Sequence, residues 1–126
     1  MLYVCSSVKK YQTFKELFFQ THKNVIDLSK VSVNKLSEEC DSIIAHHSDC
    51  AVFFGYIEPG WMLDPVDQTR IRKCFRKFSV GMVTGFPESI PHSWKNGIDT
   101  FYFSVNQNES SNSFNDGSSI QDQSNN

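Results

Sequence analysis

The pattern of apolar and polar positions is most distinctive between residues 49 and 77. Residues 50–57 are an unbroken run of apolar and aromatic side chains around one glycine, which predicts a strand buried on both faces. Asp64, Pro65 and Asp67 are typical of a helix start, with a capping side chain, a proline in the first turn and a carboxylate favoured by the helix dipole. One face of that helix should be apolar and pack inward, and it consists of Ile71, Cys74, Phe75 and Phe78.

The other periodic segments predict further strands and one further helix. Strands are expected where short apolar runs or alternating aromatic residues occur, at residues 2–6, 24–28, 79–84 and 100–105. An amphipathic helix is expected over residues 32–47, with Ser32 or Asn34 as its cap. Residues 11–21 fit the spacing of a helix and also suit a strand, so this segment stays open.

This order of elements predicts a domain of mixed α and β structure, for which two architectures remain. Our first prediction is an α+β domain, with a mixed sheet and flanking helices. The alternative is an α/β domain with an open parallel sheet, in which a ligand would bind at the carboxyl ends of the strands. Parallel or antiparallel pairing of the strand at 50–57 would distinguish the two.

Length and composition predict one folded domain followed by a polar tail. A chain of 126 residues can bury a single hydrophobic core. We expect the domain to span residues 1–105. Residues 106–126 are mostly Asn, Ser, Gln, Asp and Gly, which cannot bury enough apolar surface to become ordered.

Charge and cysteine content exclude few classes of protein, but they indicate which partners and which state of the cysteines to expect. The formal net charge is −2 and the pI is about 6.0, so no nucleic-acid or anionic membrane partner is required. No window approaches a membrane span, and we expect a soluble protein of the nucleus or cytoplasm. The four cysteines lack metal-site spacing and are expected to be buried free thiols.

Candidate functional residues surround the Pro59-Gly60 turn that follows the strand at 50–57. Large side chains near a turn and cations on an outward helix face are typical of a protein interface, and the predicted partner-binding residues are Tyr56, Trp61, Met62, Arg70, Arg72 and Arg76. We expect no catalytic residue, no metal and no cofactor. In the open-sheet alternative, Glu58 and Asp67 would instead lie near a small ligand as a nucleophile and an acid.

Residues 52–57, with Pro59-Gly60 and residues 65–69 after them, resemble the central segment of MPN domains. In catalytic members of that family, this segment carries a His-x-His-Pro motif, and a later Asp completes a zinc site. Here Glu58 stands at the first histidine position, the second histidine is missing, and only Asp67 matches a ligand. The resemblance is therefore to the non-catalytic branch, and most closely to the Abraxas-type scaffold subunits.

The resemblance covers roughly residues 2–105. It includes residues 8–11, residues 83–87, Ser93 and Phe101-Tyr102. The opening strands and the coiled coil of the family are missing from this sequence. It implies an MPN-like mixed sheet that binds no metal. It also implies a scaffold or interaction role, in which the chain pairs with a JAMM-type deubiquitinase subunit or another MPN protein in a ubiquitin-related complex, such as those of the DNA damage response. The alternative function is a small α/β enzyme that binds a nucleoside or nucleotide.

Overall fold

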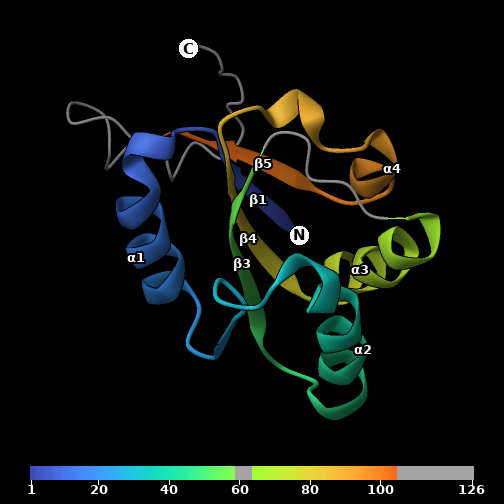
Figure 1. The fold of residues 1–126 in the computed structure, drawn as a ribbon. Helices are drawn as coiled ribbons and strands as arrows, with labels where there is room; N and C mark the ends of the chain where they lie inside the picture. The colour runs from blue at the N-terminus through green and yellow to red at the C-terminus, as the bar shows by residue number, and fades with distance from the viewer. Residues whose placement is uncertain (59–63, 105–126) are drawn as a thin grey trace.

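The computed structural model describes residues 1–58 and 64–104, which form one sheet with helices on both faces (Figure 1). The strands are β1 (Leu2–Cys5), β2 (Val25–Asp27), β3 (Ala51–Ile57), β4 (Ser79–Thr84) and β5 (Thr100–Phe103). The α-helices are α1 (Tyr11–Thr21), α2 (Leu36–His46), α3 (Pro65–Lys77) and α4 (His92–Lys95). Three short 3₁₀ turns precede α1, α2 and α4, namely η1 (Val8–Lys10), η2 (Val33–Lys35) and η3 (Pro87–Ser89).

The five strands lie in the order β2-β3-β4-β1-β5, and every pair of neighbours is parallel. The prediction of a sheet with flanking helices is confirmed. Of the two architectures that the sequence left open, the strand pairing is that of the open parallel α/β sheet. No antiparallel pair occurs among the strands of residues 1–58 and 64–104.

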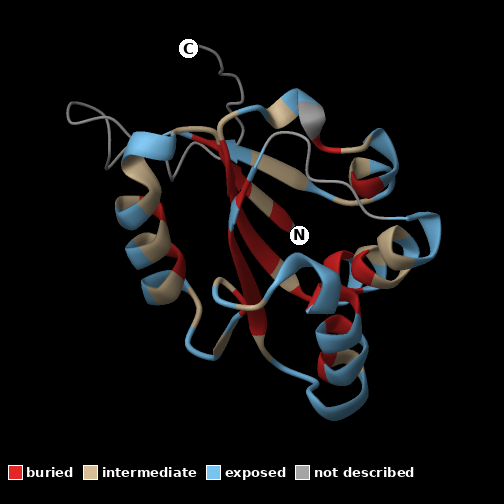
Figure 2. Ribbon diagram, viewed as in Figure 1, coloured by how far each residue is buried: buried red, intermediate tan, exposed pale blue. Residues whose placement is uncertain are grey.

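The helices are divided between the two faces of the sheet. Helix α1 packs on one face, while α2, α3 and α4 cover the other (Figures 1 and 2). From β1, the chain first moves to β2 at one side of the sheet. It then returns through β3 and β4 to β5 at the other side. Because parallel crossovers are right-handed, this reversal places the helices on opposite faces. The neighbours β1 and β4 are therefore followed by segments that leave the sheet toward opposite sides.

The larger part of the core lies under α2, α3 and α4. Phe75 of α3 is completely buried, and its ring centre lies 5.6 Å from that of Phe54 and 5.0 Å from that of Trp94. The predicted inward face of this helix is confirmed, since all four of its members are buried. The predicted cap is also confirmed, because the backbone N–H of Asp67 donates to Asp64 Oδ1 at 2.9 Å.

Residues 11–21 form the helix α1, which settles the segment that the sequence left open. Phe14 and Phe18 lie on its inner side and are buried against the sheet around Phe53. The same aromatic residues would suit a strand, so burial in the folded domain decides between the two.

Several predicted boundaries differ from the structure. Helix α2 begins at Leu36 rather than near residue 32, because residues 33–35 form a 3₁₀ turn, and the side chain of Ser32 makes no capping hydrogen bond. All four cysteines are free, as predicted, although Cys50 is only partly buried. The predicted tail lies outside the described residues. Within the described ranges, no helix has the length and apolar content needed to span a bilayer.

Candidate functional site

The segments that follow β1 and β4 meet the end of β3 at Gly85. A Cβ atom added to Gly85 would lie 3.1 Å from Cγ2 of Val8 and 3.7 Å from the hydroxyl oxygen of Tyr56. Val8 begins the 3₁₀ turn after β1, and Tyr56 is the penultimate residue of β3. Gly85 thus allows one side chain from β3 and one from the turn after β1 to approach the backbone that follows β4 at the carboxyl edge of the sheet.

Three large apolar side chains are exposed at this edge. Val8 is 49% exposed, Tyr56 39% and Phe86 50%. Phe86 directly follows Gly85, and its backbone N–H donates to Thr84 Oγ1 at 3.1 Å, which fixes the turn that carries the ring. We call Val8, Tyr56 and Phe86 the edge patch.

A β-bulge in β3 determines which side of the sheet Tyr56 takes. The register with β4 shifts between Phe53 and Gly55, so β3 contains one extra residue there. As a result, Phe54 and Ile57 both belong to the core cluster under α2 and α3, although a regular strand would turn residues three apart to opposite faces. The same shift turns Tyr56 out of that cluster.

Gly55 makes the bulge possible. Its φ is +92°, in the left-handed region that favours glycine. A Cβ at Gly55 would also lie 2.7 Å from Cβ of Ser29, which belongs to the segment after β2. The bulge is thus packed tightly against the neighbouring segment, and Tyr56 is presented by rigid backbone.

The polar groups at this edge offer little chemical reactivity. The Cys5 thiol at the end of β1 donates to the Ser7 carbonyl oxygen at 3.8 Å, and burial raises the pKa of Cys5 to about 11. It is therefore protonated at neutral pH and is not a nucleophile. Glu58 is exposed and makes no hydrogen bond or ion pair with other described residues.

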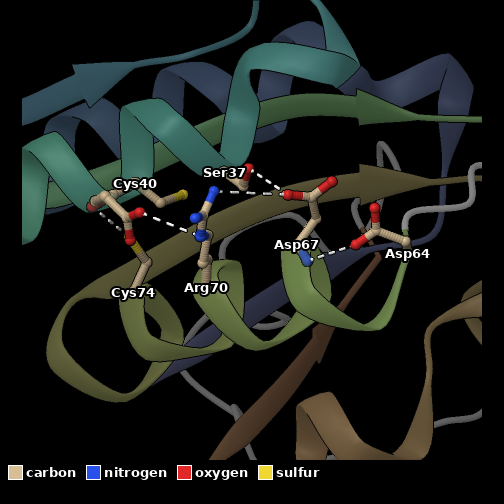
Figure 3. A network of polar contacts seen from close by, with 7 residues as sticks. Ser37, Cys40, Asp64, Asp67, Arg70 and Cys74 are labelled. Atoms are coloured by element: carbon tan, nitrogen blue, oxygen red, sulfur yellow. Dashed lines mark hydrogen bonds and ion pairs between the residues drawn. The ribbon is translucent and has the colours of Figure 1, made fainter.

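Asp67, the second residue of the predicted catalytic pair, connects two helices. It accepts a hydrogen bond of 2.7 Å from the hydroxyl of Ser37, and the guanidinium of Arg70 lies 4.0 Å from the same oxygen (Figure 3). Arg70 also forms an ion pair with Asp41 of α2 at 3.4 Å. This network joins α2 to α3 and occupies Oδ1 of Asp67.

Of the six predicted partner-binding residues, the structure describes four, and these four do not form one cluster. Arg70 is engaged in the network between α2 and α3, and Arg72 donates to the carbonyl oxygen of Asn96 at 3.3 Å. Arg76 is exposed near the end of α3, where the chain enters β4 at the amino edge of the sheet. Tyr56 lies at the opposite, carboxyl edge. Trp61 and Met62 lie outside the described residues.

Sequence reasoning found Tyr56 and missed the other two residues of the edge patch. Phe86 stands between the glycine that follows β4 and Pro87, and Val8 follows two serines, so each is an apolar residue at a turn. That signal is weak, because single exposed apolar residues are common. Only the strand order brings the two turns together.

Two hollows in the described part of the chain lie away from the edge patch. One hollow of about 220 Å³ is lined by residues including Phe75, Arg76 and Ile98, and a more open one of about 370 Å³ by His92, Lys95 and their neighbours. Neither includes a residue of the edge patch. In the part of the chain that the structure describes, no three His, Cys, Asp or Glu side chains are grouped to hold a metal ion.

No family model, curated protein or solved structure matches this chain.

Proposed function

We propose that this chain is a protein-interaction domain that binds its partner through the edge patch at the carboxyl edge of the sheet. The observation that carries the proposal is the meeting of Val8 and Tyr56 at Gly85, with Phe86 next in the chain. Exposed large apolar side chains that cluster in this way mark binding surfaces, and aromatic residues dominate the centres of interfaces.

Three features support binding rather than catalysis at this edge. The thiol of Cys5 is held protonated, the carboxylate of Asp67 is bound by Ser37 and Arg70, and the two hollows lie away from the edge. A small-molecule site would need a concave pocket with convergent polar groups. Exposed apolar side chains at an edge fit a macromolecular surface better.

The identity of the partner is a separate part of this proposal. The resemblance to MPN domains implies a JAMM-type deubiquitinase subunit and a nuclear or cytoplasmic location. An MPN sheet is mixed, whereas all the pairs here are parallel, so the fold lends that resemblance no support. We therefore propose a protein partner with an apolar docking surface, and make capture of a JAMM-type subunit one outcome of the test.

Affinity capture with matched variants tests the edge patch. Tyr102 provides the control, since it is a tyrosine with 40% exposure in β5. Proteins bound by the wild type should be retained by Tyr102→Ser and lost with Tyr56→Ser or Phe86→Ser. A central aromatic residue contributes about 2 kcal/mol or more to binding, roughly thirtyfold in affinity. Thermal melts would confirm that each variant is folded. Equal capture by all four proteins would contradict the proposal.

A second candidate function is favoured by the parallel sheet itself. Open parallel sheets bind ligands where neighbouring strands send their following segments to opposite faces, and β1 and β4 are such a pair. Glu58 is exposed at the same edge and could accept hydrogen bonds from ribose hydroxyls. This candidate is a nucleoside- or nucleotide-binding protein.

Thermal shift measurements separate the two candidates. The common nucleosides and their triphosphates should raise the melting temperature in proportion to the logarithm of their concentration. Glu58→Gln should reduce the shift. If no nucleoside or nucleotide raises the melting temperature, the second candidate is excluded, whereas the interaction domain is unaffected.

A further inference from the structure

The two outermost strands of the sheet, β2 and β5, differ in how well they are protected from further pairing. β2 has three residues and ends at Asp27, whose carboxylate lies 3.6 Å from Nζ of Lys15. Short length and charge are features that keep an outermost strand from pairing with another chain. β5 has the sequence Thr-Phe-Tyr-Phe, which contains no charge, no proline and no bulge. Of the two strands, β5 is therefore the one open to a further strand.

The backbone of β5 turns hydrogen-bonding groups to its outer side at alternate residues. The N–H of Leu2 in β1 donates to the carbonyl oxygen of Asp99 at 2.8 Å, and β5 pairs with β1 in parallel. In such a pair, every second residue directs both of its backbone groups at the neighbouring strand. Asp99 and Phe101 thus face β1. Thr100 and Tyr102 direct their N–H and C=O groups to the outer side, where no other described strand pairs with β5.

The side chains of β5 place an aromatic ring on each face of the sheet. Phe101 lies on the face of α1, where its ring stacks on that of Tyr3 with 5.8 Å between the ring centres. Tyr102 lies on the other face, where Nζ of Lys95 in α4 is 5.3 Å from the centre of its ring. Phe101 is partly buried, and Tyr102 is 40% exposed. A strand added beside β5 would cover both rings further.

We propose that β5 pairs antiparallel with β5 of a second copy of this chain, with Thr100 opposite Tyr102 of that copy. The outward backbone groups fix this register. In an antiparallel pair, opposed residues whose groups face each other exchange two hydrogen bonds. A two-fold axis makes the pair of Thr100 and Tyr102 occur twice, so the outward groups of both residues are satisfied in both copies. A register shifted by two residues would pair only one of the two residues.

The side chains of β5 are compatible with this register. Phe101 meets Phe101 of the second copy on the two-fold axis as a pair without hydrogen bonds, in which the Cα atoms lie about 4.5 Å apart. Aromatic residues at such positions stabilise a sheet, and each Phe101 is already stacked on Tyr3. Asp99, the charged residue before the strand, comes opposite Phe103 rather than opposite its own copy. Like charges therefore do not meet within the paired strands.

The expected assembly is a closed dimer. Pairing through β5 joins five strands from each copy into one sheet, whose outermost strands are the two protected copies of β2. A contact that uses the same surface on both copies closes on itself and cannot extend into a filament. Because β5 has four residues, the contact is small, and small interfaces are typical of weak complexes. The dimer should therefore depend on concentration.

Sedimentation equilibrium of the full chain tests the dimer. The average mass should rise from 14.5 kDa toward twice that value as the concentration increases. Tyr102→Pro should stay monomeric, because proline lacks the outward N–H and is tolerated where that group is not used within the sheet. Val25→Pro is the matched control in β2. Since the N–H of Ala51 donates to the carbonyl oxygen of Asn24, Val25 also faces outward, and this variant should dimerise like the wild type.

A wild type that remains monomeric up to about 1 mM would overturn the proposal, because association would then be negligible. Dimerisation of a folded Tyr102→Pro variant would overturn it as well. The contact would then lie elsewhere on the surface.

Charge-swapped variants keep the proposal testable if proline unfolds the domain. One variant carries Thr100→Glu and Tyr102→Glu, and the other carries Thr100→Lys and Tyr102→Lys. Each should be monomeric by itself, because like charges directly opposite each other destabilise a strand pair. An equimolar mixture should form a heterodimer at least about tenfold tighter than either homodimer, a difference of about 1.4 kcal/mol. If thermal melts show both variants to be folded and the mixture stays monomeric, the pairing of β5 is refuted.

Disulfide formation between two copies tests the register. Both test variants also carry Cys50→Ser, because Cys50 is the native cysteine that is not fully buried. Phe101→Cys should form a dimer under oxidised glutathione, since the two positions meet on the axis. Tyr102→Cys should form far less, because diagonal positions lie about 7–8 Å apart, beyond the reach of about 7 Å for a disulfide. Equal yields would overturn the proposed register.

The edge patch lies outside this contact, so the two proposals fail independently. Partners captured by the edge patch should still bind Tyr102→Pro, whereas Tyr56→Ser and Phe86→Ser should leave the dimer intact. Loss of the dimer in those two variants would assign self-association to the edge patch and overturn the role of β5.

Discussion

The hydroxyl of Ser37 on α2 donates a hydrogen bond of 2.7 Å to Oδ1 of Asp67 on α3. Ser37 is only 3% exposed, so this carboxylate is the partner that compensates the burial of its hydroxyl. The backbone N–H of Asp67 is in turn bound by the capping side chain of Asp64. One residue thus secures the start of α3 and its contact with α2.

Asp67→Ala should destabilise the protein by about 1–3 kcal/mol, because it leaves a buried hydroxyl without its acceptor. Asp64→Ala removes only the cap and should cost about 1 kcal/mol. Urea unfolding of Ser37→Ala, Asp67→Ala and the double variant would measure the coupling between the two side chains. A coupling energy below about 0.3 kcal/mol would mean that the hydrogen bond contributes nothing.

Phe75→Ala should cost about 3–5 kcal/mol, since a completely buried ring between Phe54 and Trp94 would be replaced by a cavity. Arg76→Ala, the next residue in the helix, should change stability by less than about 0.5 kcal/mol, because its side chain is exposed. Thermal or denaturant unfolding checks both. A small effect of Phe75→Ala would show that α3 does not pack as described.

Gly55→Ala should destabilise more than Gly97→Ala, although both glycines have positive φ values of +92° and +74°. An alanine at Gly97 would have only the backbone cost of about 1–2 kcal/mol, because no atom beyond its two chain neighbours lies within 4 Å of the new Cβ. At Gly55 the new methyl group would also collide with Ser29 at 2.7 Å. Equal melting temperatures for the two variants would contradict the tight packing of the bulge.

His22 should make stability depend on pH. Burial lowers its pKa below the usual value of about 6.5, so the unfolded chain binds the proton more readily than the folded one. Its contribution is therefore fully present above about pH 6.5 and decreases as the pH falls through that value, until the folded-state pKa is passed.

The variant His22→Phe should flatten this dependence. It keeps an aromatic ring against Phe18 and Tyr3, which lie 4.6 and 5.6 Å from the imidazole between ring centres. His46→Gln is the control, because His46 is exposed. Denaturant unfolding between about pH 4 and pH 8 provides the measurement. An unchanged slope in His22→Phe would assign the titration to another group.

Local patterns predicted much of the fold because they depend on neighbouring residues. The start of α3 at Asp64 and Pro65 follows from cap chemistry, and its inward face follows from helical spacing. The sheet could not be predicted in this way, since its order depends on pairings between distant segments, such as Leu2 with Val80. Our first prediction of a mixed sheet reflects that limit.

For the candidate site too, local features could be predicted from the sequence, whereas contacts between distant segments could not. Tyr56 could be identified from its place beside a turn, but its approach to Gly85, which Val8 also approaches, depends on the order β3-β4-β1 and on the bulge at Gly55. Asp67 was predicted as a catalytic candidate from its position near the strand end. Ser37, which occupies it, is 30 residues away in the chain.

The strand order also has a consequence for how the chain reaches its native state. β1 is synthesised before the other four described strands, yet its neighbours in the sheet are β4 and β5, so Leu2 cannot pair until Val80 and Thr100 have been synthesised. Contacts between such distant segments slow folding, because a long loop must close before they form. In a nascent chain, the apolar strand β1 would thus stay unpaired until nearly the whole domain has left the ribosome. We therefore expect chaperones to contact β1 early in synthesis.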